Sequence, residues 1–503
     1  MTSIILGGAV SENLSTTTDK KVEIDLSMLT RHGIISGATG TGKTVSLQIL
    51  VEQLSQQGIP VFTADAKGDL AGLAVAGTPH AKIDERLNFI GLEKEKDFVH
   101  KGVPSVFWDI YGQKGHPIRT TVSEMGPLLL SRLLDLSNTQ DAILYMIFKI
   151  ADDEGLLLID LKDLKSVVKF VGKNRKEFSS EYGNVSTASI NAITRQILVL
   201  EEAGGTEFFG EKAFDFNQLL KKDFSGNGVV NILDAQKLMH NNRIYSAFLL
   251  WLLSELFEQL PEVGDVEKPK LVFFFDEAHL LFKDAPKVLI EKVEQVVRLI
   301  RSKGVGVFFV TQNALDIPEE VRGQLGNRIQ HALRAFTPKE QKSVKIAAQT
   351  FRKNPRFITE EKIGNMKVGY ALVSNLDKDG APTIVEHTMM RPPQSRMGVL
   401  TDAERNEKIK NSPVYGVYEQ KIDNESAFEV LKERAEKKQA EAEVERENER
   451  TSSGGFLESL FTAGSGKKSS RQGYVETLTK QVIRSLGSRL VTKIVRGILG
   501  SMK

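Results

Sequence analysis

The sequence contains no cysteine and only eight histidines. Without cysteine there are no disulfide bonds, thiolate zinc sites, iron–sulfur clusters or cysteine nucleophiles. No two histidines stand at a spacing that would place them together on one helical face. Zinc hydrolase chemistry is therefore not expected. The lack of thiols also suits the reducing cytoplasm, where we expect the protein.

Long apolar runs and a surplus of one charge are also missing. The most apolar run, residues 247–253, is much shorter than the ~18 residues that a membrane-spanning helix needs. The 67 Lys and Arg residues nearly balance the 65 Asp and Glu residues, for a formal net charge of +2. That balance excludes a strongly cationic protein that coats nucleic acid, but it leaves room for local basic surfaces.

Short β-like runs alternate with helical stretches over residues 1 to about 400. The stretch 43–57 has the apolar spacing of a helix, and Gly58 is a suitable stop. This alternation predicts an α/β fold with a mostly parallel sheet. The strand candidates are residues 33–36, 61–64, 229–233, 271–275, 305–311 and 330–336.

The chain divides into four predicted parts before a C-terminal tail. Residues 1–114 and 228–400 form the two parts of the α/β core, and residues 115–227, with stronger helical periodicity, form a mostly helical insertion. Residues 401–472 form a charged, partly disordered linker. Its charge run, residues 431–450, is either a solvated helix or disordered.

A phosphate-binding loop is the strongest motif. Residues 37–44 match the pattern G-x-x-x-x-G-K-[ST], with a strand candidate before them and a helix candidate after them. Glycine lets the backbone N–H groups close around phosphates, and the helix adds the positive end of its dipole. Lys43 would contact the β- and γ-phosphates, and the Thr44 hydroxyl would bind Mg²⁺. The nucleotide-binding residues are Gly37, Ala38, Thr39, Gly40, Thr41, Gly42, Lys43 and Thr44.

Two carboxylates follow the apolar run 271–275. Such a run predicts a strand buried on both faces, and its carboxyl end is where an α/β sheet places ligands. Asp276 is suited to hold Mg²⁺ through water, and Glu277 is suited to act as a general base on an attacking water. The pair favours ATP hydrolysis over phosphate transfer to a second substrate.

Two further strand ends carry polar side chains. Gln312 follows the run 305–311, and its amide would hold the lytic water and sense the γ-phosphate, unless it only caps a turn. Asp65 and Lys67 follow the run 61–64. They either reach the metal shell or a DNA-facing loop, or form a surface turn with paired charges.

An arginine is expected to stabilise charge on the leaving phosphate, often from a neighbouring subunit. Arg328, just before the strand candidate 330–336, is our choice for this finger. The alternatives are Arg301, Arg322 and Arg334.

Together these motifs resemble the HerA/FtsK superfamily of hexameric P-loop ATPases, and they are most similar to the bacterial HerA-like ATPases of the YjgR type. The resemblance rests on residues 32–44, 65–70, 274–281 and 326–336 and covers about residues 1–400. It implies a RecA-like core, ATP with Mg²⁺, and a ring, expected to be a homo-hexamer. It also implies that Lys43 and Thr44 bind nucleotide, Asp276 and Glu277 are the acidic pair, Gln312 is the sensor and Arg328 is the finger acting in trans.

The resemblance has limits. Archaeal HerA proteins carry a β-barrel before the ATPase, but only 36 residues precede Gly37, so no such barrel is expected. The membrane spans and the DNA-reading winged helix of FtsK are not apparent either. The ATPase motor therefore carries over, whereas translocation on double-stranded DNA is a hypothesis.

The tail, residues 473–503, has an apolar residue at every third or fourth position and six basic residues against one acidic residue, a net charge of +5. This pattern predicts a basic amphipathic helix. Three roles are open: docking on the core or a neighbouring subunit, peripheral attachment to an anionic membrane surface, or contact with nucleic acid.

Three functions follow from these features. The first is a hexameric DNA-dependent ATPase, helicase or translocase. The second is a motor that acts on protein or membrane, as in secretion. The third is a nucleotide-binding scaffold with slow turnover, against which Glu277 and Gln312 argue, because binding alone needs neither side chain.

Overall fold

The computed structural model describes residues 2–10, 18, 20–283 and 287–461. The chain divides into two compact units, residues 1–431 and 432–503. The predicted basic helix of residues 473–503 lies outside the described residues. Among the described residues, no helix combines the length and the apolar character needed to cross a membrane.

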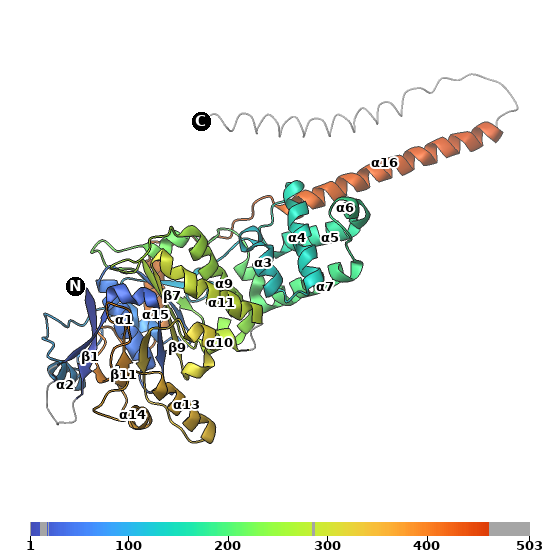
Figure 1. Cartoon of the computed structure of the whole chain (residues 1–503). Helices are drawn as coiled ribbons and strands as arrows, with labels where there is room; N and C mark the ends of the chain where they lie inside the picture. The colour runs from blue at the N-terminus through green and yellow to red at the C-terminus, as the bar shows by residue number, and fades with distance from the viewer. Residues whose placement is uncertain (1, 11–17, 19, 284–286, 462–503) are drawn as a thin grey trace. The chain divides into compact units, whose positions relative to one another are not determined.

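One twelve-stranded sheet forms the centre of the first unit (Figure 1), in the order β2-β1-β12-β11-β10-β3-β9-β8-β4-β7-β5-β6. Every pairing from β10 to β6 is parallel, and every pairing from β2 to β10 is antiparallel. The predicted α/β class with a mostly parallel sheet is therefore confirmed. The strands are β1 (Ser3–Ala9), β2 (Lys21–Asp25), β3 (Gly33–Ser36), β4 (Val61–Asp65), β5 (Ser105–Asp109), β6 (His116–Pro117), β7 (Val230–Asp234), β8 (Leu271–Phe275), β9 (Val305–Thr311), β10 (Asn327–Gln330), β11 (Tyr370–Ser374) and β12 (Glu386–Met390).

Helices pack on both faces of this sheet. In order they are α1 (Lys43–Gln56), α2 (Ala81–Ile90), α3 (Val122–Leu133), α4 (Asn138–Asp153), α5 (Leu161–Lys173), α6 (Arg175–Glu181), α7 (Thr187–Leu200), α8 (Thr206–Phe208), α9 (Asn242–Gln259), α10 (His279–Phe282), α11 (Lys287–Ile300), α12 (Glu319–Arg322), α13 (Pro338–Gln349), α14 (Thr359–Asn365), α15 (Asp402–Lys410) and α16 (Ala427–Phe461). Helix α1 packs on one face, and α9 and α11 pack on the other.

Strand β8 shows why the central strands are apolar throughout. Its side chains alternate between two cores: Val272 and Phe274 pack with α1, whereas Phe273 and Phe275 pack with α9 and α11. Alternate side chains of a strand point to opposite faces, so a sheet covered on both faces needs apolar residues at every position. The continuous apolar run is the consequence.

The predicted strand at residues 330–336 is wrong, because β10 ends where that strand was expected to begin. Beyond Gln330 the chain leaves the ladder and turns over the loop that follows β3: Ala38 N donates to Ala332 O at 2.8 Å. Leu333 N donates to Ile363 O at 3.2 Å. Ala332 and Leu333 are buried against α13 and α14, so their apolar character comes from packing beneath helices.

Helices α3 to α8 lie between β6 and β7 in the chain, and α3, α4, α5 and α7 gather into one bundle (Figure 1). The predicted insertion, residues 115–227, covers them, but it also includes β6, which pairs with β5 in the sheet. In α5 the apolar spacing buries Leu164, Val167, Val168 and Val171.

Part of the predicted linker, residues 401–472, is packed structure. Between α15 and α16 the chain buries Val414 and Tyr418, and the Tyr418 ring lies 5.5 Å from that of Trp108 in an edge-on contact. The charge run 431–450 is helical, within α16. The linker looked unstructured in sequence because its few apolar residues have partners about 300 positions away.

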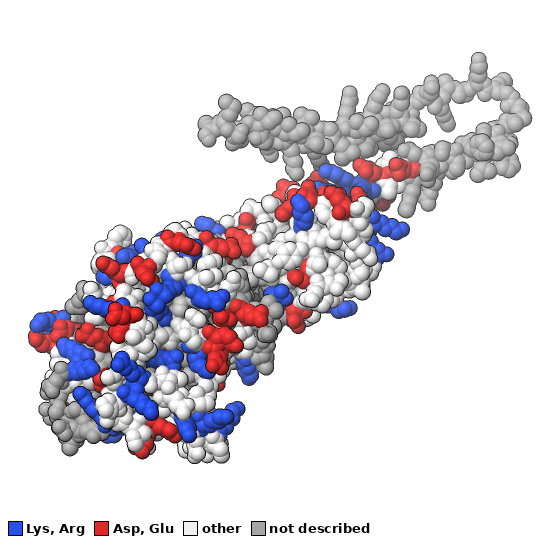
Figure 2. Space-filling model, viewed as in Figure 1, with Lys and Arg blue, Asp and Glu red and all other residues white. Residues whose placement is uncertain are grey.

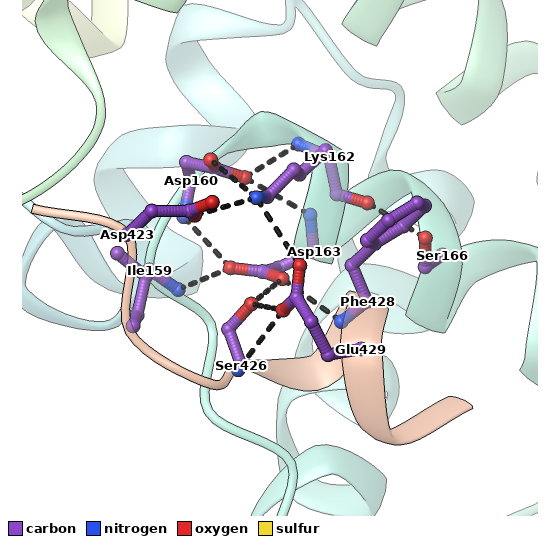
Figure 3. Close-up of polar contacts among 9 residues, drawn as sticks. All are labelled: Ile159, Asp160, Lys162, Asp163, Ser166, Asp423, Ser426, Phe428 and Glu429. Carbon is purple, nitrogen blue, oxygen red and sulfur yellow. Dashed lines mark hydrogen bonds and ion pairs between the residues drawn. The ribbon is translucent and has the colours of Figure 1, made fainter. Parts of the chain in front are cut away.

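The residues before α16 and its first turn are fixed to the start of α5 (Figure 3), a contact that we call the α5 clasp (residues 159–163 and 423–429). Asp163, which is fully buried, accepts two backbone hydrogen bonds at Oδ2, from Ile159 and Asp160, each 3.0 Å long. At Oδ1 it accepts one from Phe428 N at 2.9 Å, and the Ser426 hydroxyl lies 2.6 Å away. Lys162 and Glu429 form an ion pair at 3.3 Å beside it.

Candidate functional site

The loop after β3 has the backbone shape that its glycines allow. Gly42 has φ of +111°, in the left-handed region that favours glycine. A Cβ on Gly37 would lie 2.5 Å from the Cβ of His331, so the close approach of these segments also requires glycine. Helix α1 begins at Lys43 without a side-chain cap. Its first N–H groups therefore suit an anion.

Lys43 lies within this loop and is only 6% exposed. Its Nζ donates to Ala38 O at 3.1 Å. Burial lowers the pKa of Lys43, and the nearby Glu277 carboxylate offsets this only in part. A buried ammonium held by one carbonyl oxygen is short of negative charge, which bound phosphates would supply.

Asp276 follows β8 and is 3% exposed, and its Oδ2 atom has no hydrogen-bond partner. Burial, and then repulsion from Glu277, raise the pKa of Asp276 to about 7. Thr44 hydrogen-bonds Asp69, whose pKa is raised by burial and whose Oδ1 atom also lacks a partner. Mutually repelling carboxyls beside a threonine hydroxyl fit a divalent cation. Mg²⁺ in particular takes few protein ligands and shares its shell with phosphates and water.

Glu277 is 5% exposed and adopts a φ of +47°, which is uncommon for a residue other than glycine. Its Oε1 atom forms an ion pair with Lys67. Its Oε2 atom lies 3.4 Å from Gln312 Nε2, which donates to it, and 3.4 Å from His279 Nδ1. Burial, the largest single influence, opposes the charge on Glu277, but the hydrogen bond and charge of Lys67, the hydrogen bond from Gln312 and the charge of His279 together outweigh it and lower the pKa of Glu277. Glu277 is therefore a carboxylate at neutral pH.

Sheet topology brings these residues together. Strands β3, β9, β8 and β4 are neighbours in that order, and all four are parallel. The phosphate-binding loop, Gln312, the acidic pair and the turn 65–69 follow their carboxyl ends. The sequence-predicted residues of the loop, the acidic pair and the sensor therefore meet at one edge of the sheet.

The turn after β4 belongs to the same edge. Asp65 is 1% exposed and fixes the turn: Oδ1 accepts from Gly68 N at 2.7 Å and Oδ2 accepts from Leu70 N at 3.2 Å. Burial, and then Asp69, raise the pKa of Asp65 to about 7. Through Lys67 and Asp69 this turn contacts Glu277 and Thr44. The turn therefore borders the predicted metal shell. The alternative, a surface turn with paired charges, holds only for Lys67, because Asp65 is buried and Asp69 Oδ1 has no partner.

Arg328 is not brought to this edge within one chain. It lies inside β10, opposite Ile34 of β3, and its Nε donates to Leu325 O at 3.2 Å. Burial, and then Arg322, lower the pKa of Arg328. The alternatives are held elsewhere: Arg301 pairs with Asp265 at 2.6 Å, Arg322 reaches Ala314 O at 3.4 Å, and Arg334 donates to Gly364 O at 2.8 Å.

His331 is a site residue that sequence reasoning did not single out. It is fully buried, and burial lowers its pKa to about 4, so the imidazole is neutral. Nδ1 donates to Tyr370 O at 2.9 Å, which leaves Nε2 to accept from the Ser46 hydroxyl at 2.9 Å. His331 thereby holds the phosphate-binding loop and α1 against β11. No local signal pointed to this role, because β10 has only one apolar residue and both partners of His331 are distant in sequence.

Comparisons with known proteins bear on the family and the fold. The family model described as Helicase HerA-like C-terminal matches residues 11–503. Unbound TrwBΔN70, a bacterial conjugative coupling protein, is 15% identical and has a TM-score of 0.50, covering 79% of this chain and 95% of its own.

Two further structures of the plasmid coupling protein TrwB, each 14% identical, show the same likeness. The complex with the GTP analogue GDPNP has a TM-score of 0.51 and covers 79% of this chain and 96% of its own. The complex with ADP and Mg²⁺ has a TM-score of 0.50 and covers 78% and 97%. No curated protein matches the chain. At this identity the likeness concerns the fold, and it confirms the predicted RecA-like core.

Proposed function

The chain belongs to the helicase HerA-like C-terminal family, and on that premise we propose that it is a motor ATPase that hydrolyses ATP with Mg²⁺ to move along DNA. One observation carries the hydrolytic part: the ionised Glu277 lies close enough to Lys43 of the phosphate-binding loop to affect its pKa, and it accepts a hydrogen bond from Gln312, at one edge of the sheet. Nucleotide binding alone needs no buried carboxylate at that position.

Each side chain has a distinct task in this proposal. Lys43 and the first N–H groups of α1 bind the β- and γ-phosphates, and Thr44 and Asp276 hold Mg²⁺. The metal ion neutralises charge on the phosphate oxygens. Glu277 takes a proton from a water molecule as the oxygen of that water attacks the γ-phosphorus. The bond between the γ-phosphorus and the oxygen that bridges it to the β-phosphate breaks, and ADP leaves. Gln312 orients that water.

The solved relatives support the nucleotide and the metal. TrwB has been determined with ADP and Mg²⁺, and with analogues of GTP and ATP. In this chain, the buried Asp276 Oδ2 without a partner is the counterpart that a bound cation would satisfy.

We further propose a homo-hexameric ring in which Arg328 of one subunit acts on the nucleotide of the next. None of the four arginine candidates contacts the phosphate-binding loop or the acidic pair of its own chain. A finger from a neighbouring subunit would complete the site.

DNA contact is proposed as a local feature. On the face seen in Figure 2, basic and acidic side chains are interspersed over the described residues, as the net charge of +2 leads one to expect. A DNA surface is therefore a patch, such as a ring channel, and not the whole outer face. Cytoplasmic location, with peripheral attachment to the membrane through residues 473–503, stays a prediction.

The test is the ATPase rate of the purified full-length chain with and without single- and double-stranded DNA. We expect stimulation by DNA and no turnover in Lys43→Ala, because Lys43 is the buried cation of the loop. Wild-type turnover that neither DNA form stimulates would favour the second candidate, a motor acting on protein. The coupling role of TrwB in conjugation is the observation that keeps this candidate.

A further inference from the structure

Both carboxylate oxygens of Glu277 have polar neighbours within the site. Oε1 is bonded to Lys67, and Oε2 has Gln312 Nε2 and His279 Nδ1 each at 3.4 Å. A general base must accept a proton at one of these oxygens. The Lys67 ammonium takes up one lone pair of Oε1 and so competes with an attacking water for that oxygen, and opening the ion pair favours hydrolysis.

The two partners differ in their freedom to move. The Glu277 side chain is 7% exposed, whereas the Lys67 side chain is 46% exposed. The backbone around Lys67 is fixed, because Asp65 Oδ1 accepts from Lys67 N at 3.3 Å and from Gly68 N at 2.7 Å. Opening is therefore a swing of the flexible lysine side chain while the turn stays in place.

We propose that Lys67 is a positioning residue that locks Glu277 while the site is empty and releases Oε1 when a nucleoside triphosphate with Mg²⁺ binds. This inference rests on the proposed function. A triphosphate brings several negative charges to an edge where Lys67 is held by one carboxylate, so the ammonium is drawn from Glu277 toward the phosphates. ADP, without the γ-phosphate, leaves the lock closed. The lock thus ties the activity of the base to the presence of hydrolysable nucleotide.

Thermal unfolding of the full-length chain tests the lock without relying on turnover. Wild type, Lys67→Met, Glu277→Gln and the double variant are melted alone, with ADP and Mg²⁺, and with a non-hydrolysable ATP analogue and Mg²⁺. We expect the two substitutions to be non-additive in Tm without nucleotide and with ADP, and additive with the analogue. Equal coupling in all three states would make the pair a permanent structural contact, and no coupling in any state would also overturn the lock.

Turnover gives the second test, with two matched variants. Lys67→Met should raise the rate without DNA, by up to about fivefold if the pair resembles other half-exposed ion pairs. Lys67→Arg keeps the charge and should match wild type. Lys114→Met is the control, because Lys114 is 44% exposed and lies near Asp234 at the same edge of the sheet; it should also match wild type.

A fall in turnover in Lys67→Met overturns the lock, as does the same rate in the methionine and arginine variants. If the wild-type chain binds the analogue but hydrolyses no ATP, the proposed function fails, while the melting experiment still decides whether Lys67 and Glu277 separate on binding.

Discussion

Two buried acidic clusters in the first unit are built in opposite ways. At the α5 clasp each oxygen of Asp163 accepts at least one backbone N–H hydrogen bond, and the Ser426 hydroxyl lies within hydrogen-bond distance of both Asp163 and Glu429. At the sheet edge, Asp276 Oδ2 and Asp69 Oδ1 have no hydrogen-bond partner. The pKa values of Glu429 and Asp276 differ as well: burial works against the charge of Glu429, yet hydrogen bonds from Ser426 help to lower its pKa to about 2, whereas burial raises the pKa of Asp276 to about 7. Burial also raises the pKa of Asp160 in the clasp.

The difference separates structural from functional charge. A buried carboxylate with enough donors stabilises the fold, and one without them costs free energy that the rest of the fold must offset. A protein keeps an unpaired buried carboxylate at a position where a bound ligand supplies the missing partner. On this criterion the α5 clasp is a structural contact that stabilises the fold, and the sheet edge is a binding site.

Matched glutamate substitutions give the largest expected contrast. Glu277→Gln should lower ATP turnover by about 10²–10⁴-fold, because the amide cannot accept the proton from water, while nucleotide affinity is kept. Glu429→Gln makes the same chemical change at the clasp and should leave turnover within about twofold of wild type. Steady-state ATPase assays and nucleotide titration measure both. Turnover retained in Glu277→Gln would remove Glu277 from its role as base.

At the clasp, Asp163→Ala should lower the free energy of unfolding by about 3 kcal/mol, because two or more buried donors lose their acceptor. Denaturant unfolding followed by tryptophan fluorescence suits this test, since Trp108 packs against Tyr418 of the adjoining segment. ATP turnover under native conditions should stay near that of wild type. A large loss of turnover with unchanged stability would mean that the clasp acts on the site.

At the sheet edge the corresponding change should act in the opposite direction. Asp276→Asn removes an unpaired, repelling charge, so the nucleotide-free protein should gain about 1 kcal/mol of stability. The same variant should lose Mg²⁺-dependent hydrolysis, because a metal ligand is gone. Thermal melts with and without Mg²⁺ and an ATP analogue check both statements. A destabilised, still active variant would contradict the assignment of Asp276 to the metal.

Local sequence signals predicted one of these clusters and not the other. The glycine-lysine loop and the apolar run ending in Asp276 and Glu277 are contiguous, so their chemistry can be read over a few residues. The clasp joins α5 to residues more than 260 positions later, and no spacing rule detects such a pair. The strands β1 and β12 escaped prediction for the same reason, since Gly7 pairs with Met390 and glycine weakens the strand pattern.

The two clusters should change the stability of the protein over different pH ranges. The pKa of Asp276 is raised to about 7 in the folded state, above its unfolded value of ~3.9. At a pH between these two values, the folded protein keeps the proton on Asp276, whereas the unfolded chain has lost it. Stability of the nucleotide-free protein should therefore fall by about 1 kcal/mol from pH 6 to pH 8.

Glu429 cannot contribute to that slope, because its lowered pKa of about 2 means its stabilisation is complete above ~4.5 and is lost only as the pH falls toward 2. Other groups titrate near neutrality, so the decisive quantity is the difference between wild type and Asp276→Asn in thermal melts. We expect a shallower slope in the variant, and in wild type with Mg²⁺ and an ATP analogue. Identical slopes would show that Asp276 is already ionised at pH 6. The contrast between the sheet edge, where carboxylate oxygens lack partners, and the α5 clasp, where they have them, would then rest on hydrogen-bond geometry alone.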